Sequence, residues 1–139
     1  MKKALFVVLL VLLFITGCNS NKYIVKSSYN VNEEAMIDDI VLKLTDVKYH
    51  NNKLEVVFDI KNNTKNTYTI GEDSFKMYDI NQVLVSNEYH NENNIIKKGQ
   101  TISHTLIYEV PKKEIYEIYF YSGFVNNNIK FVITSTDLN

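Results

Sequence analysis

Three histidines are the side chains with the greatest metal-binding and acid–base capacity in this chain of 139 residues. His50, His90 and His104 lie far apart in the sequence and fall on different expected elements. His104 follows the alternation of Ile102 and Leu106, which predicts a core face, where a histidine is more often hydrogen-bonded than a metal ligand. His50 flanks a turn and His90 a loop, so we expect both to be solvated. We predict no metal site and no cofactor.

The other candidates for catalysis lack the spacing that such sites require. Glu33-Glu34 and Asp38-Asp39 could lie near one another, but they do not match a calcium-binding loop, and we expect solvated charges. Ser27-Ser28 and Ser103 lack the G-x-S-x-G context of a nucleophile elbow. The four glycines are isolated, so there is no glycine-rich phosphate loop. The sequence therefore favours a protein that is not an enzyme, with a small envelope enzyme kept as an alternative.

Cys18, the single cysteine, follows a segment that has the parts of a secretory signal. Lys2 and Lys3 supply positive charge, residues 4–15 are apolar without interruption, and small residues precede the cysteine. The alternative is an uncleaved membrane helix. The apolar segment is shorter than the roughly 20 residues that such a helix needs, and its flanks are those of a signal.

The tetrapeptide Ile15-Thr16-Gly17-Cys18 resembles the lipobox of bacterial lipoproteins. The resemblance implies cleavage between Gly17 and Cys18 and a diacylglyceryl group on the Cys18 thiol. Two acyl chains on one residue anchor a protein stably, whereas one chain holds it only weakly. We expect a signal peptide over 1–17, the lipidated cysteine and a tether over 18–28, and a folded domain over 29–139, on the extracytoplasmic face of the bacterial cell membrane.

Composition limits the partners of the mature chain. Removal of residues 1–17 leaves 122 residues, and the net charge changes from −1 to −3 because Lys2 and Lys3 are lost. All fifteen basic residues are lysine. A weakly acidic protein without arginine lacks the electrostatic attraction to phosphates that nucleic-acid binding needs. A length of this kind fits one domain that buries about two thirds of its unfolded surface.

The apolar pattern after the tether has a period of two, which is typical of half-buried strands. It runs over 40–44 and 54–60, and its phase shifts by one near Thr45-Asp46, which predicts a β-bulge. Asn51-Asn52 predicts a tight turn between these strands. A short helix over Asn32 to Asp39 is an alternative to a strand that continues from Ile37. Further strands are expected at 68–70, 74–80, 83–88, 101–110, 116–121 and 129–134.

Several segments, in this order and spacing, resemble a family of bacterial extracellular proteins of unknown function with a telokin-like, immunoglobulin-like domain. The mycobacterial immunoprotective secreted antigen belongs to the same structural group. The segments are Val31-Asn32-Glu33, the strand from Leu54 to Thr64, Phe75 to Asp79, Lys98 to Ile102 and Leu106 to Pro111. The resemblance covers about Tyr29 to Ile133 and implies an all-β, immunoglobulin-like antiparallel sandwich of about seven to nine strands. Lys98 stands where the family usually has a proline before the glycine. The family supplies no catalytic residues.

Tyrosines near the carboxyl terminus are the remaining candidates for function. Tyr119 and Tyr121 share one face of an expected strand, and Ile118 and Phe120 share the other. If the second face is core, the tyrosines form an exposed stripe suited to an interface. The alternative is that they simply satisfy β-propensity.

From these features we expect a membrane-anchored, non-catalytic binding module with an envelope protein or glycan as its partner. A protective lipoprotein, for instance one that excludes phage DNA, is the alternative outside the binding class.

Overall fold

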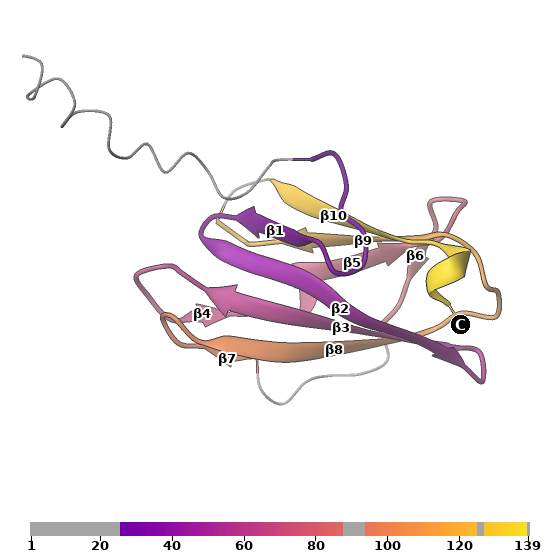
Figure 1. Cartoon of the computed structure of the whole chain (residues 1–139), viewed down its shortest axis with the longest axis horizontal. Helices are drawn as coiled ribbons and strands as arrows, with labels where there is room; N and C mark the ends of the chain where they lie inside the picture. The colour runs from indigo at the N-terminus through magenta and orange to yellow at the C-terminus, as the bar shows by residue number, and fades with distance from the viewer. Residues whose placement is uncertain (1–25, 88–93, 125–126, 139) are drawn as a thin grey trace, which may run out of the picture.

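The computed structural model describes residues 26–87, 94–124 and 127–138, which form two packed antiparallel sheets (Figure 1). One sheet has the strand order β1-β2-β3-β8 and the other β10-β9-β5-β6, while β4 and β7 form a separate pair. The predicted all-β antiparallel sandwich is confirmed. The signal peptide, the lipobox and most of the tether lie outside the described residues. Within the described part, no helix is long and apolar enough to cross a bilayer.

The described residues contain ten strands, three of them only two residues long. The strands are β1 (Glu34–Ile37), β2 (Ile40–His50), β3 (Lys53–Asn62), β4 (Tyr68–Thr69), β5 (Phe75–Tyr78), β6 (Leu84–Val85), β7 (Ile95–Ile96), β8 (Thr101–Glu109), β9 (Tyr116–Tyr121) and β10 (Asn128–Ile133). Two 3-10 turns are η1 (Glu72–Ser74) and η2 (Ser135–Asp137). The pair β4–β7 lies at one end of the sandwich and the carboxyl terminus at the other (Figure 1).

A hairpin joins β1 to β2, so the continuous strand expected from Ile37 is wrong, and so is the helix over Asn32 to Asp39. Asp38 and Asp39 have φ angles of 50° and 62°. Both central residues of a type I′ turn need this left-handed conformation, and aspartate tolerates it better than most residues. The Ser122 hydroxyl donates a hydrogen bond to the Asp38 carboxylate. The acidic pair is therefore a structural turn.

The long hairpin of β2 and β3 confirms two predictions. The register shifts between Leu44 and Asp46, which is the expected bulge, and Thr45 Oγ1 donates to the Val57 carbonyl at 3.1 Å. Asn51 and Asn52 make the turn with φ angles of 50° and 61°. The extra residue of the bulge shifts the alternation by one position, so that Val47 and Tyr49 face the core after it.

Two of the strands predicted in the second sheet are shorter than expected. The segment 74–80 divides into the end of η1 and β5. Of the segment expected at 83–88, the described part, 83–87, forms only β6, because the chain then leaves this sheet. Asn87 bridges to Tyr108, and its Oδ1 accepts the Ile107 N–H at 3.1 Å. The connection from β6 therefore crosses to the edge of the opposite sheet.

Aromatic rings from both sheets meet in the core. Phe58 of β3 is fully buried, and its ring centroid lies 5.0 Å from that of Phe75 and 5.1 Å from that of Phe131. Burial of a side chain of this size is worth about 1.5–3 kcal/mol. The inward residues of β2, β3, β8, β9 and β10 complete one continuous core. A packed core of this kind holds the outward residues of each strand in fixed positions.

Candidate functional site

The outward side chains of the β10-β9-β5-β6 sheet form a surface that we call the tyrosine face. Along β9, Ile118 and Phe120 are fully buried, whereas Tyr119 and Tyr121 are half-buried on the opposite side. The register places Lys76 of β5 and Lys130 of β10 beside Tyr119, and Tyr78 of β5 beside Glu117. The tyrosine face consists of Lys76, Tyr78, Leu84, Glu117, Tyr119, Tyr121 and Lys130.

Contacts within the tyrosine face hold its rings in place. The Tyr119 hydroxyl donates to Glu117 at 2.8 Å, and the Lys130 ammonium bonds the same carboxylate at 3.0 Å. The rings of Tyr78 and Tyr119 meet edge to face, with centroids 5.6 Å apart and an interplanar angle of 89°. The Lys76 ammonium lies 5.6 Å from the centroid of the Tyr121 ring. A Lys130–Tyr119 contact at 6.0 Å completes the network.

The protonation states on this face follow from the same contacts. Burial, supported by the hydrogen bond to Glu117, raises the pKa of Tyr119 to about 12. The Tyr119 hydroxyl and the Lys130 ammonium lower the pKa of Glu117. At neutral pH Tyr119 is therefore a neutral hydroxyl and Glu117 a carboxylate. Such a surface can bind a partner through contact area, hydrogen bonds and cation contacts.

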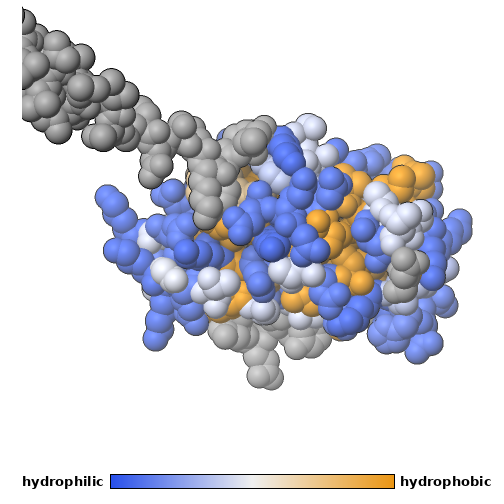
Figure 2. Space-filling model, in the orientation of Figure 1, coloured by the Kyte–Doolittle hydropathy of each residue, from blue (hydrophilic) through white to orange (hydrophobic). Residues whose placement is uncertain are grey.

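The outward face of the other sheet has a different character. Among the described residues, the outward side chains of β2, β3 and β8 include no tyrosine or phenylalanine. Val57 and Ile107 lie among them, and most of the others are charged or carry a hydroxyl: Lys43, Asp46, Lys48, Glu55, Asp59, Lys61, Ser103 and Thr105. On the tyrosine face, by contrast, Leu84 pairs with Tyr78 and is 56% exposed. In the view of Figure 2, hydrophilic side chains cover most of the surface and apolar ones show between them in patches. The two faces are thus not equivalent as binding surfaces.

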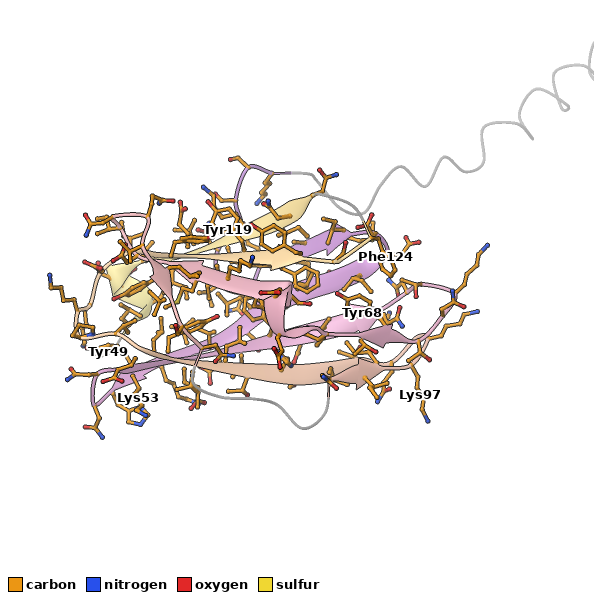
Figure 3. The ribbon with its side chains drawn as sticks, turned by 180° about the vertical axis from the view of Figure 1, so that it is seen from behind. Tyr49, Lys53, Tyr68, Lys97, Tyr119 and Phe124 are labelled. Atoms are coloured by element: carbon orange, nitrogen blue, oxygen red, sulfur yellow. The ribbon has the colours of Figure 1, made fainter. Side chains whose placement is uncertain are left out.

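The aromatic residues divide among distinct regions of the molecule. Figure 3 shows Tyr49 and Lys53 at one end of the sandwich, Tyr68 and Phe124 toward the other, and Tyr119 on the upper sheet. The Tyr49 hydroxyl donates to the Val110 carbonyl at 3.0 Å, and the Tyr68 hydroxyl to the Ser122 carbonyl at 3.0 Å. These two tyrosines fasten the ends of the sandwich. The tyrosine face does not share that role.

A second candidate site is a pocket between the sheets, bordered by β5, β6 and β8. Its volume is about 400 Å³. His104 lines it and is 5% exposed, as its place in the alternation of β8 predicts. The His104 ring stacks on Phe75, with centroids 5.5 Å apart and planes 17° from parallel. Burial lowers the pKa of His104 to about 4, so the imidazole is neutral at pH 7.

The remaining predicted site residues do not assemble into a chemical centre in the described residues. His50 is exposed at the end of β2. His90, Gly17 and Cys18 lie outside the described residues. Glu33 binds Lys26 at 2.7 Å. Across the described ranges, no three His, Cys, Asp or Glu side chains gather closely enough to hold a metal ion.

Sequence reasoning missed the neighbours of Tyr119 and the inter-sheet pocket. In the alternation of β5, Lys76 and Tyr78 point to the side opposite the buried Met77, so the face that they share could have been predicted from the sequence. The sequence does not predict which strands flank β9, because that depends on pairing between distant segments. The pocket depends on the packing of two sheets, for which no local pattern exists.

Comparisons with known proteins identify the fold. No protein-family model matches the chain, and no curated protein matches it in sequence. Among solved structures, a candidate lipoprotein of Bacillus subtilis, ycdA, is 20% identical, with a TM-score of 0.61 over 75% of this chain and 39% of its own. This chain thus corresponds to about two fifths of ycdA. The yjhA protein of Bacillus subtilis has a TM-score of 0.63 at 11% identity, over 80% of this chain and 99% of its own.

The expected likeness to the mycobacterial antigen group is confirmed for the fold. MPT63, a secreted protein of Mycobacterium tuberculosis, has a TM-score of 0.57 at 11% identity, over 82% of this chain and 99% of its own. Identities this low show a shared architecture and transfer no function. The function has to be argued from the surfaces of this chain.

Proposed function

We propose that this chain is a lipid-anchored, non-catalytic binding module of the bacterial cell envelope, and that its tyrosine face holds a protein partner. The lipobox, Ile15-Thr16-Gly17-Cys18, supports the anchor and the extracytoplasmic location. The tyrosine face carries the binding proposal, because tyrosine is enriched at interfaces and supplies a large apolar area with a polar tip.

The geometry favours a protein over a glycan as the partner. Sugars stack on rings that present a flat, open platform, but Tyr78 and Tyr119 are perpendicular. The ammonium groups of Lys76 and Lys130 already lie near the rings of Tyr121 and Tyr119. The exposed Leu84 adds apolar area beside Tyr78. Tyrosine is enriched in the cores of protein interfaces, whereas lysine is depleted there and belongs to the polar rim.

The tether enters beside this sheet. Tyr29 pairs with β10: its N–H donates to the Lys130 carbonyl at 2.9 Å, and its carbonyl accepts the Val132 N–H at 2.8 Å. A tether of about ten residues reaches at most roughly 35 Å. We therefore expect the partner to be a membrane protein or another protein held close to the membrane.

Crosslinking in intact cells tests this proposal. A tagged chain is treated with a short lysine-reactive crosslinker, and captured proteins and crosslinked lysines are identified. We expect one recurrent envelope protein, linked through Lys76 or Lys130. The double variant Tyr119→Ala/Tyr121→Ala should lose it, whereas Glu55→Ala/Lys61→Ala on the opposite face should keep it.

Both variants must retain the wild-type thermal transition for the comparison to count. Equal capture by the two variants would refute the tyrosine face as the binding surface. Retention of the chain on purified wall glycan, lost in the Tyr119→Ala/Tyr121→Ala variant, would show that the choice of partner class was wrong.

A further inference from the structure

Phe124, which follows β9, is the most exposed large hydrophobic side chain among the described residues, at 61%. Its ring lies beside that of the buried Tyr68, with centroids 5.8 Å apart, and the Tyr68 hydroxyl binds the Ser122 carbonyl. The Phe124 N–H donates to Ser122 Oγ at 3.4 Å, and Gly123 turns the chain before it with a φ angle of 84°. An aromatic ring is thus held in a fixed position in water, where covering it would be favourable.

One end of the sandwich, which we call the Phe124 end, consists of Phe124, the turn at Asp38-Asp39 and the loops at 63–67 and 97–100. Hydrogen bonds join these segments to their neighbours: from Ser122 to Asp38, from Asn63 to Asp39 and from Gly99 to Asn62. Figure 3 shows Phe124, Tyr68 and Lys97 toward this end.

The chain enters the domain from the Phe124 end. Tyr29 bridges Phe131 in parallel, so the residues before Tyr29 run back toward the start of β10, which lies at this end (Figure 1). Cys18 stands eight positions before Lys26, the first described residue. Eight residues reach at most roughly 28 Å. A lipid on Cys18 would therefore hold this end of the domain close to the bilayer.

The opposite end also exposes apolar side chains, and the tether serves it less well. Val83 and Ile115 there are 57% and 43% exposed. Tyr121 pairs with the first residue of β10, and Ile115 lies six residues before Tyr121, which is about 20 Å along a strand at roughly 3.4 Å per residue. To bring that end to the bilayer, the tether would have to stretch along the sheet for most of its reach, at a cost in conformational entropy.

Charges at the Phe124 end are balanced. Four exposed lysines lie there with four exposed carboxylates: Lys61, Lys65, Lys97 and Lys98, with Asp38, Asp39, Glu72 and Asp73. Attraction to anionic lipid is therefore not what selects this end. Phenylalanine and lysine are nevertheless residues that membrane-surface segments use, because the ring enters the acyl boundary and the lysine stem is buried while its ammonium stays in water.

We propose that the Phe124 end rests on the lipid surface, with the Phe124 ring between headgroups and acyl chains and the ammonium groups of Lys97 and Lys98 at the headgroup phosphates. This inference rests on the proposed anchor at Cys18. It stands β9 upright on the membrane, so that the tyrosine face points sideways, toward a partner in the same membrane.

Tryptophan fluorescence tests the proposal, because the chain contains no tryptophan. The lipidated chain carrying Phe124→Trp is placed in vesicles of phosphatidylcholine and phosphatidylglycerol, with ordinary acyl chains or with chains brominated near the headgroup. Bromine quenches a tryptophan that it contacts. We expect brominated lipid to quench the Phe124→Trp emission and to leave that of Val83→Trp unchanged. Val83 is the matched control because it is similarly exposed at the opposite end.

Two lysine pairs test the headgroup contact in the Phe124→Trp chain. Lys97→Gln/Lys98→Gln should weaken the quenching, whereas Lys112→Gln/Lys113→Gln, an exposed pair at the opposite end, should not. Equal effects of the two pairs would refute the role of Lys97 and Lys98.

Flotation with the vesicles reports the anchor separately from the quenching. A chain that floats but shows no quenching of Phe124→Trp, or equal quenching of Phe124→Trp and Val83→Trp, overturns this proposal and leaves the anchor standing. A chain that does not float refutes the anchor, and this inference with it.

Discussion

Replacement of Asn62 by alanine should destabilise the domain more than replacement of any exposed asparagine. The Asn62 side chain is fully buried at the end of β3. Its amide donates to the Asn66 carbonyl at 2.8 Å and to the Ile96 carbonyl at 2.9 Å, and its Oδ1 accepts the Thr64 N–H at 2.9 Å. One side chain therefore fastens the loop after β3 and the strand β7.

The size of the effect follows from these three bonds. Each hydrogen bond is worth about 0.5–1.5 kcal/mol net, and partners left buried without one cost more. We expect Asn62→Ala to lower the free energy of unfolding by about 3 kcal/mol. In a domain of about 110 residues, that corresponds to a melting temperature roughly 10–15 °C lower.

Urea unfolding of a soluble form of residues 19–139 measures this difference. Asn63→Ala is the matched control, because Asn63 is the same residue type one position away and is exposed. It should change stability by less than about 0.5 kcal/mol. In Asn62→Ala, hydrogen exchange should also quicken at Ile70, whose N–H bonds the segment that leads into β7. If Asn62→Ala were as stable as Asn63→Ala, the hydrogen bonds of Asn62 would not be what holds the loop after β3 and the strand β7 in place.

Three further predictions concern pH, the bulge and the anchor. Burial lowers the pKa of His104 from 6.5 to about 4. Between these pH values the unfolded chain binds more protons than the folded chain does. The free energy of unfolding should therefore fall by up to about 3 kcal/mol as the pH drops from above 6.5 to 4. His104→Phe should flatten this dependence in urea titrations at successive pH values, and a curve parallel to the wild type would contradict the argument. Deletion of Thr45 should remove the bulge and leave a regular strand, and the domain should still fold. Deletion of Lys43 should expose the buried Leu44 and lower the free energy of unfolding by about 2–5 kcal/mol, measured by thermal unfolding. If both deletions lowered it equally, the bulge would not be what sets the register of β2. Cys18→Ser should release the protein from salt-washed membranes, and its retention there would argue against the lipobox.

Local pattern was sufficient for much of the fold. The period of two along 54–60 and 116–121 determined which side chains face the core, because adjacent residues of any strand point to opposite sides. The same rule exposed the bulge near Thr45, where the phase changes. It also placed His104 inside and Tyr119 and Tyr121 on a shared outer face. The turn at Asp38-Asp39 was missed because an aspartate pair indicates a tight turn less strongly than an asparagine pair does.

The sequence by itself determined the class of fold, the facing of the strands and the lipobox that predicts an anchor, since each depends on neighbouring residues. Only the tertiary structure decided which strands lie side by side. β9 pairs with β5, some 40 residues earlier, and this pairing brings Lys76 and Tyr78 to Tyr119. The packing of β8 against β5 likewise set the His104 ring on Phe75 and buried the Tyr108 hydroxyl, for which the described residues offer no hydrogen-bond partner. Such contacts depend on how both sheets fill one shared core, and no periodicity along a single strand specifies them.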